Sequence, residues 1–362
     1  MIRTYFYLIL ISLSFTACAD DSGSGSGSVT DTYNRTEVLE NLTDNIILPS
    51  YNAFYSALED FDTATNTYVN DPTQVNLDVV KAEWLISYKL WQHVEMFDLG
   101  KAEEISYNQR MNAYKSNTTQ IDINIEQGMI DFSAANEPSY LSQGFPAIDY
   151  VLYGLADGLL EGTSDKYRLY LGALVDELLS NTNLCITDWN TNRDAFVSDA
   201  TNTATSSFNI LANDFVYYYE KGLRANKVGI PAGYFGSKTF PEFVEAYYKQ
   251  DVSKVLLLES ISAAENFFLG KKYGTDQTGE SFKTYLEHLD SDTELPKEIS
   301  DEFELIRLQI AKLENNFVTQ IETNNIEYLR AFDAIQKNVP NFKVSMLAAF
   351  KVSTDYADAD GD

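Results

Sequence analysis

The sequence predicts an all-α fold made of two tandem helical bundles. Apolar and aromatic residues recur every three or four positions along most of the chain, which is the helical period. Strand signals are few, and the eight prolines and eighteen glycines fall mostly between the periodic runs. A motif of the first half returns in weaker form in the second half, which is typical of internal duplication. Together these observations predict two similar helical bundles.

The N-terminus has the pattern of a bacterial lipoprotein signal. A short positive start is followed by an apolar stretch at residues 5–15, too short to span a bilayer, and by small residues that end at Cys18. We expect residues 1–17 to be removed and lipid to be attached to Cys18, which anchors the chain to a membrane. Residues 18–33 are rich in glycine and serine and form a flexible tether.

The predicted location is the outer membrane, as a lipoprotein that faces the periplasm or the cell surface. The acidic pair Asp20-Asp21 after Cys18 resembles the surface-export signal of Bacteroidetes lipoproteins. The chain carries a net charge of −28, which excludes nucleic acid as a partner and attracts cationic ligands. With Cys18 lipidated, Cys185 has no disulfide partner and reads as a buried apolar residue.

The first helical segments form the N-terminal bundle, at residues 34–223. An apolar stripe begins near Leu39 and continues beyond Pro49, where we expect a kink or break. The next stripe, at residues 76–98, places Trp84, Trp91 and Glu95 on one face. A carboxylate on an aromatic face is costly unless it is paired or bound to a cation. We expect Glu95 to pair with a Lys or Arg of a neighbouring helix, or to bind a cation.

The remaining segments follow in order. Residues 100–143 have no sustained period and predict loops and short helices, although residues 121–125 alternate as a short strand would. A glycine-rich and proline-containing connection at residues 224–240 separates the two bundles. The C-terminal bundle occupies residues 241–362. The other predicted helices start at Pro146 or cover residues 166–190, 203–223, 241–268, 298–322 and 325–351.

The repeated motif carries one acid in each half. Residues 144–154 read Gly-Phe-Pro-Ala-Ile-Asp-Tyr-Val-Leu-Tyr-Gly, and residues 262–270 read Ser-Ala-Ala-Glu-Asn-Phe-Phe-Leu-Gly. Asp149 and Glu265 occupy corresponding positions. The first copy resembles the G-x-H-x-x-E signature of the imelysin family, helical bacterial proteins named after a peptidase and also found in iron uptake. Here Pro146 replaces the histidine and Asp149 replaces the glutamate.

Two further motifs extend the resemblance to about residues 36–355. Trp84, Trp91, Glu95 and Phe97 match a tryptophan-rich helix of the family, and Lys-Val-Gly-Ile-Pro-Ala-Gly at residues 227–233 matches a turn between its halves. The resemblance implies a duplicated helical fold with a pocket where the halves meet. The residues that we expect in this pocket are Trp84, Trp91, Glu95, Phe145, Pro146, Asp149 and Glu265.

The residues argue against a catalytic zinc site. Such a site commonly uses imidazole ligands, and the only histidines, His93 and His288, have no metal-ligand spacing. Pro146 has no lone pair and suits the first turn of a helix. Asp149 suits either that helix N-terminus or a binding role. If Glu95, Asp149 and Glu265 met, they would form an oxygen-rich site for ferric iron or another hard cation.

The sequence therefore predicts a lipid-anchored, non-catalytic binding protein of the envelope or cell surface. The resemblance links it to iron or haem acquisition, with uptake components as partners. One alternative is a metallopeptidase-like hydrolase with a divergent carboxylate site. Another is a surface lipoprotein that binds glycan or protein, which the 24 tyrosines would serve. Carboxylates that converge in the pocket would favour a cation, whereas a flat aromatic shelf would favour a glycan.

Overall fold

The computed structural model describes residues 33–129, 131–155, 159, 165–289 and 294–356. The predicted signal, Cys18 and nearly all of the tether lie outside the described residues. The chain from Tyr33 to Asp362 forms one compact unit. Its described residues form helices, with one isolated β-bridge between Lys271 and Thr278 and no strand, so the all-α prediction is confirmed.

A continuous helical rod opens the unit. It comprises α1 (Arg35–Leu42), a π-helical turn (Thr43–Ile47) and α2 (Leu48–Asn70). The break expected at Pro49 is absent. Proline lacks a backbone N–H, but as the second residue of α2 it follows directly on the wider π turn, in which Leu48 N–H bonds to the carbonyl of Thr43.

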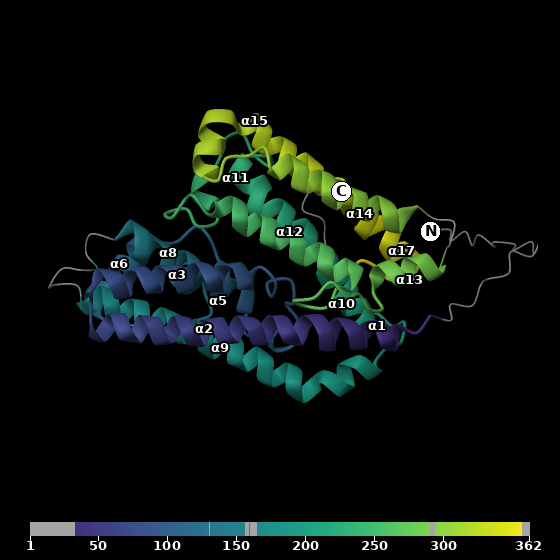
Figure 1. The fold of residues 1–362 in the computed structure, drawn as a ribbon, viewed down its shortest axis with the longest axis horizontal. Helices are drawn as coiled ribbons and strands as arrows, with labels where there is room; N and C mark the ends of the chain where they lie inside the picture. The colour runs from purple at the N-terminus through teal and green to yellow at the C-terminus, as the bar shows by residue number, and fades with distance from the viewer. Residues whose placement is uncertain (1–32, 130, 156–158, 160–164, 290–293, 357–362) are drawn as a thin grey trace, which may run out of the picture. The chain divides into compact units, whose positions relative to one another are not determined.

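Helices α3 (Gln74–Trp91) and α9 (Asp165–Ser198) pack along α2 (Figure 1). The apolar stripe of α3 is fully buried, but the helix ends at Trp91, earlier than expected. The N–H groups of Gln92, His93 and Val94 bond three residues back and tighten the chain into turns. Glu95 therefore leaves the aromatic face on which a longer helix would have placed it.

Short helices fill the segment between α3 and α9. They are α4 (Lys101–Glu104), α5 (Tyr107–Asn112), α6 (Thr118–Gln127), α7 (Glu137–Tyr140) and α8 (Gly144–Asp149), the last continued by a π-helical turn (Tyr150–Gly154). The alternating residues 121–125 belong to α6 and form no strand. The side chain of Asn117 caps this helix by accepting the N–H of Gln120, and Gly128 ends it in the left-handed conformation.

A helical run crosses the predicted connection at residues 224–240. It comprises α10 (Ser207–Tyr217), a π-helical segment (Tyr218–Gly229) and α11 (Ile230–Ala232). The expected helix at 241–268 begins late. Only a 3-10 turn (Pro241–Phe243) precedes α12 (Ser253–Leu269), because Ala246 and Gln250 adopt positive φ angles that an α-helix excludes. Residues 244–252 therefore form a loop, which we call the 244–252 loop.

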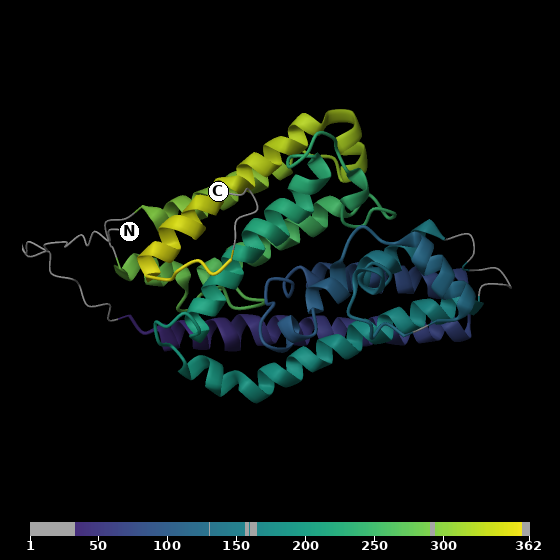
Figure 2. The ribbon, with the colours of Figure 1, turned by 180° about the vertical axis from the view of Figure 1, so that it is seen from behind.

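The C-terminal helices are α13 (Phe282–Leu289), α14 (Leu295–Ile310), α15 (Phe317–Gln336), α16 (Asn338–Pro340), a π-helical turn (Asn341–Met346) and α17 (Leu347–Phe350). The predicted helix 298–322 is divided at residues 311–316, where Asn316 caps α15 through the N–H of Thr319. Helix α14 packs against both α12 and α15, and α12 also contacts α3. Seen from behind, the green and yellow C-terminal helices lie together on one side of the purple rod (Figure 2). None of the described helices is long and apolar enough to cross a membrane.

The predicted internal duplication is not confirmed. Asp149 ends the six-residue helix α8, whereas Glu265 lies within the seventeen-residue helix α12. The two acids thus occupy different helix positions.

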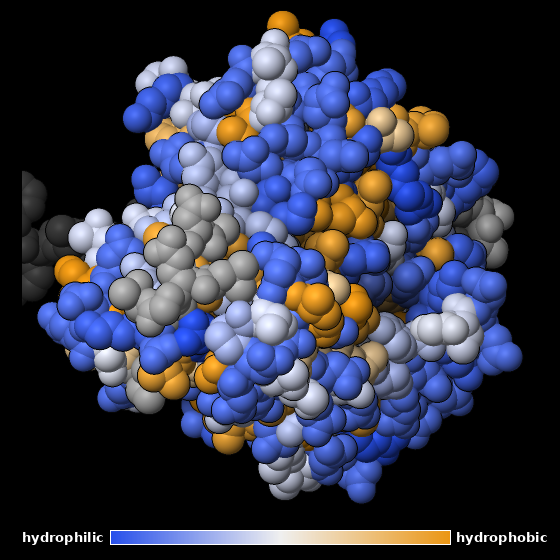
Figure 3. Space-filling model, turned by 60° about the vertical axis from the view of Figure 1, so that its left-hand side comes forward, coloured by the Kyte–Doolittle hydropathy of each residue, from blue (hydrophilic) through white to orange (hydrophobic). Residues whose placement is uncertain are grey.

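The face drawn in Figure 3 is mostly hydrophilic, in keeping with the strongly acidic composition, with a smaller group of hydrophobic residues near its centre.

Candidate functional site

A buried ion cluster lies where α3, the π-helical segment and the 244–252 loop meet. The Nζ atom of Lys227 lies 2.8 Å from Oε2 of Glu95 and 2.6 Å from Oε1 of Glu245. The three residues are 3%, 8% and 4% exposed, respectively. The expectation that Glu95 pairs with a lysine of a neighbouring element is confirmed.

Two amide side chains complete this ion cluster. Gln92 accepts a hydrogen bond from Lys227 at 2.8 Å, so the three donors of the ammonium meet three acceptors. Asn112 donates to Glu95 at 3.1 Å and to Glu245 at 2.8 Å. Both carboxylates are therefore bonded by this protein's own groups.

Each member of the cluster is itself held in place. Tyr88 donates to the amide oxygen of Asn112 at 2.7 Å, and Ser260 donates to that of Gln92 at 2.6 Å. Ser253, the first residue of α12, donates to the backbone carbonyl of Glu245 at 2.7 Å. This last bond fixes the 244–252 loop next to the helix that follows it.

Electrostatics keep Lys227 charged. Burial alone would lower the pKa of its ammonium, but the carboxylates of Glu245 and Glu95 outweigh burial and raise it. Burial raises the pKa of Glu95, with a further contribution from Glu245, while Lys227 opposes the shift. The cluster is thus a lysine between two acids that share it.

Asp149 ties the imelysin-like motif to the second half of the chain. Its buried carboxylate accepts the backbone N–H groups of Tyr248 and Lys249, at 2.8 and 3.0 Å. Burial raises its pKa to about 7, against the effect of these two bonds. Asp149 lies in the second turn of α8, and Pro146 is the third residue of that helix, not the first.

Gly144 sets the position of α8. Its φ angle is +75°, and a Cβ there would overlap the carbonyl oxygens of Arg110 and Met111. This close approach brings α8 against α5, the helix that ends at Asn112. Pro146 and Asp149 then line a cavity of about 460 Å³ together with Glu245.

The three acids expected to bind a metal are not brought together. Glu265 forms a bidentate ion pair with Arg307, Asp149 binds the 244–252 loop, and Glu95 binds Lys227. Among the described residues, no three His, Cys, Asp or Glu side chains are arranged to hold a metal ion. The donor set of the ion cluster does not fit a metal, because the ammonium of Lys227 already lies between its carboxylates.

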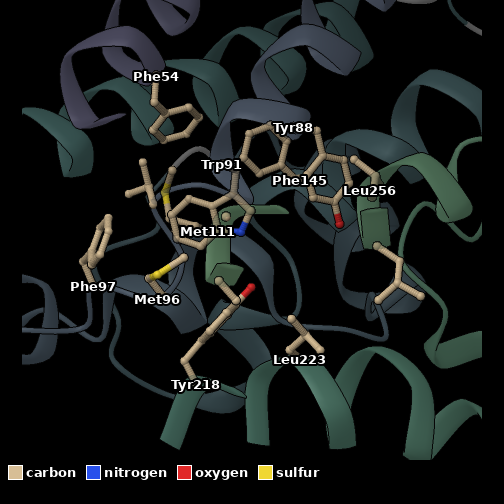
Figure 4. Packing of buried hydrophobic residues seen from close by; sticks show 14 of the residues in the cluster. Phe54, Tyr88, Trp91, Met96, Phe97, Met111, Phe145, Tyr218, Leu223 and Leu256 are labelled. Atoms are coloured by element: carbon tan, nitrogen blue, oxygen red, sulfur yellow. The ribbon is translucent and has the colours of Figure 1, made fainter. Parts of the chain in front are cut away.

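Three of the expected pocket residues belong to the hydrophobic core. Trp84, Trp91 and Phe145 are fully buried, and Phe145 stacks on Tyr88 with ring centroids 4.4 Å apart. Figure 4 shows Trp91, Tyr88 and Phe145 close together beneath Phe54. None of the three expected residues lines the cavities on either side of the ion cluster.

A larger cavity, of about 1080 Å³, lies on the other side of the cluster, and Glu95 and Asn112 form part of its wall. Among the described residues, seven acidic side chains line it, including Asp98, Asp214 and Asp355, against one basic side chain, Lys221. That lysine lies 3.6 Å from Glu220. Eight aromatic side chains of the described part of the chain also line it. We call this space the acidic cavity.

Two acids of the acidic cavity lack partners for a buried oxygen. Neither Oδ1 of Asp98 nor Oδ2 of Asp214 has a hydrogen-bond partner among the described residues. Burial raises the pKa of Asp98 to about 6, with contributions from Glu103 and Glu95. Burial raises the pKa of Asp214 to about 8, and the nearby Asp98 and Asp355 add to the shift. The crowding of acids and their burial thus make both carboxyl groups hold their protons more tightly than an ordinary aspartate does.

Sequence reasoning missed Lys227, Glu245, Asn112 and Asp214 as site residues. Lys227 was visible as the first residue of the turn motif at 227–233, and a cation beside a family motif is a signal for an acid partner. Glu245 and Asn112 carry no such signal. Their roles depend on the loop and on the end of a short helix, which periodicity does not reveal.

Comparisons with known proteins agree with this architecture. The family model described as imelysin matches residues 47–337. The curated Iron-regulated protein A of Synechococcus elongatus is 24% identical over 155 residues, which are 42% of this chain and 40% of that protein. The matched part is thus less than half of that relative's length.

Two solved structures share the fold. An imelysin-like protein from Psychrobacter arcticum 273-4 gives a TM-score of 0.71 at 14% identity, with 89% of this chain and 97% of that chain covered. A putative iron-regulated protein A precursor from Parabacteroides distasonis gives 0.72 at 15% identity, with 87% and 95% covered. At these identities the likeness concerns the fold alone.

Proposed function

The chain belongs to the imelysin family, and we propose that it is a non-catalytic binding protein of the cell envelope with a role in iron acquisition. Its ligand is cationic and occupies the acidic cavity. The excess of acids in that cavity is the single observation that carries the proposal. The names of the relatives, which are called iron-regulated, support the link to iron.

The donor chemistry supports binding rather than hydrolysis. A hydrolytic metal needs protein ligands and an open position for water. Glu95 and Glu245 are bonded to Lys227 and Asn112, and Pro146 offers no lone pair where the family signature has imidazole. The residues present therefore fit a structural ion cluster better than a catalytic metal.

The cavity also favours a cation over the other ligands that the sequence suggested. Haem carries two propionates, which seven acidic side chains would repel. A glycan would favour a flat aromatic shelf, but Tyr217 and Tyr356 meet edge to face, at 84°. The number of acidic side chains around this one space is the feature that favours a cation.

The location in the envelope rests on the N-terminal sequence. The apolar stretch before Cys18 and the flexible tether after it match lipoprotein processing. We expect the mature chain to partition into membranes through a lipid on Cys18, and Cys18→Ser to abolish this. Unchanged membrane association of that variant would disprove the anchor.

Growth of the host under iron limitation tests the role in acquisition. A deletion strain should grow more slowly than the wild type when an iron chelator is present, and added ferric iron or the wild-type gene should restore growth. The purified mature chain should hydrolyse no casein. Equal growth of the two strains with the chelator would reject the role in iron acquisition, and chelator-sensitive proteolysis would reject the non-catalytic assignment.

A further inference from the structure

The acidic side chains of the acidic cavity come from separate elements of the fold. Asp98 follows the turn after α3, Asp214 lies in α10, and Asp355 lies near the C-terminus. We propose that this cavity binds an extended organic cation, a molecule with two or more ammonium groups joined by an apolar chain. The inference rests on the cavity being the ligand site and names the chemical class of its ligand.

The geometry disfavours a single metal ion. A hard cation such as Ca²⁺ needs about six or more oxygen ligands at one point. No three acids among the described residues share such a point, although seven line the cavity. Acids spread over separate elements instead suit charges that are themselves spread along a molecule.

Asp98 and Asp214 are the anchors for the ammonium groups. Each has a buried carboxylate oxygen without a hydrogen-bond partner. A buried, unpaired carboxylate is costly, and an ammonium removes this cost because it supplies both charge and N–H donors. The one lysine of the wall, Lys221, lies by Glu220 at 3.6 Å and does not neutralise these two acids.

Tyr218 adds a polar group to the wall of the acidic cavity. It lines the cavity next to Glu95 and is only 4% exposed, and its hydroxyl lies beside the side chains of Glu95 and Ser260. Its oxygen can accept a hydrogen bond from an ammonium group at the inner end of the cavity.

The rest of the wall fits the apolar chain of such a ligand. Eight aromatic side chains, including Tyr217, Tyr218 and Tyr356, provide faces for methylene groups and for cation–π contacts. The volume of about 1080 Å³ matches pockets that enclose organic ligands of drug size. Both the charges and the size therefore point to the same class of ligand.

Calorimetric titration of the mature chain with spermine tests the proposal. At an ionic strength of about 0.15 M, which screens exposed charges, we expect saturable binding of one spermine per chain. Asp98→Asn with Asp214→Asn should weaken binding by at least about tenfold, since two charge-assisted hydrogen bonds are lost. Tyr218→Phe should weaken it less. The control, Asp60→Asn with Asp333→Asn, makes the same charge change at exposed positions outside the cavity and should bind as the wild type does.

Three outcomes would overturn the proposal: no saturable binding by the wild type, equal weakening in the control, or displacement of spermine by equimolar Mg²⁺. Thermal melting without ligand checks that each variant is folded, and a spermine-dependent rise in melting temperature gives a second readout. Failure of spermine binding leaves the growth phenotype under iron limitation intact. A missing growth phenotype likewise leaves spermine binding measurable, so the two proposals fail separately.

Discussion

The ammonium of Lys227 lies 2.6 Å from a carboxylate oxygen of Glu245, and both side chains are almost completely buried. With Glu95 at 2.8 Å on its other side, the lysine occupies the place between two acids where a hard cation would otherwise bind. Charge neutralisation at this junction is therefore supplied by a residue of the chain itself.

Replacing Lys227 by methionine should destabilise the fold. The substitution keeps an unbranched chain of similar length but leaves Glu95 and Glu245 buried without their cation. Removal of one partner from a buried ion pair costs about 3–5 kcal/mol. Urea unfolding at neutral pH measures the loss. The control Lys238→Met removes an exposed lysine and should stay within about 0.5 kcal/mol of the wild type. Equal stability of Lys227→Met and wild type would show that the pair contributes nothing.

The same variant should gain a cation site. Without Lys227, the oxygens of Glu95, Glu245 and Gln92 face the space left by the ammonium, and carboxylate and amide oxygens are ligands that Ca²⁺ accepts. We expect added CaCl₂ to raise the melting temperature of Lys227→Met and to leave that of the wild type nearly unchanged. An equal rise in both proteins would place calcium elsewhere on the acidic surface.

The acidic cavity should make the free protein less stable as pH rises. The pKa of Asp98 is raised to about 6 and that of Asp214 to about 8, from an ordinary value of 3.8. Between pH 3.8 and about pH 8 the folded chain holds more protons than the unfolded chain. The free energy of unfolding therefore falls as the pH increases. Below the ordinary pKa of 3.8, both aspartates are protonated in the folded and in the unfolded chain, so they no longer change the stability with pH.

The variant Asp98→Asn with Asp214→Asn cannot ionise at these positions and should lose this part of the pH dependence. At about pH 8 its free energy of unfolding should exceed that of the wild type by at least about 1.4 kcal/mol, the equivalent of one pKa unit. At about pH 4 the difference should be small. Urea unfolding at several pH values measures both. A wild type that is the more stable protein at high pH would mean that the two carboxylates have partners in solution.

Sequence reasoning predicted the class of fold and the pairing of Glu95 with a basic side chain, because both follow from the local pattern of apolar residues. The aromatic stripe through Trp84 and Trp91 had to face a core, and an acid near it had to find a partner. The identity of that partner, Lys227, depends on a contact between two residues that lie far apart in the chain. No local pattern encodes such a contact.

The failures of the prediction have the same origin. Glu265 repeats the position of Asp149 in the motif, but α12 directs it to Arg307, which lies outside both copies. The 244–252 loop carries apolar and aromatic residues with a spacing compatible with a helix, yet positive φ angles at Ala246 and Gln250 break it. That break frees the N–H groups of Tyr248 and Lys249 for Asp149, which is a tertiary effect.

Asp149 should control the order of the 244–252 loop. Its carboxylate is the acceptor for the backbone N–H groups of Tyr248 and Lys249, and Asp149→Ala would leave both donors without a partner. Each unsatisfied buried donor costs about 1–3 kcal/mol, so the loop should open more often and these two amides should exchange hydrogen faster. Hydrogen exchange followed by mass spectrometry measures this directly. Asp251→Ala, which removes an exposed aspartate of the same loop, is the matched control and should leave their exchange unchanged. If Asp149→Ala exchanged as slowly as the wild type at these amides, the loop would be held by Ser253 and its neighbours, and the aspartate of the motif would have no positioning role for Glu245.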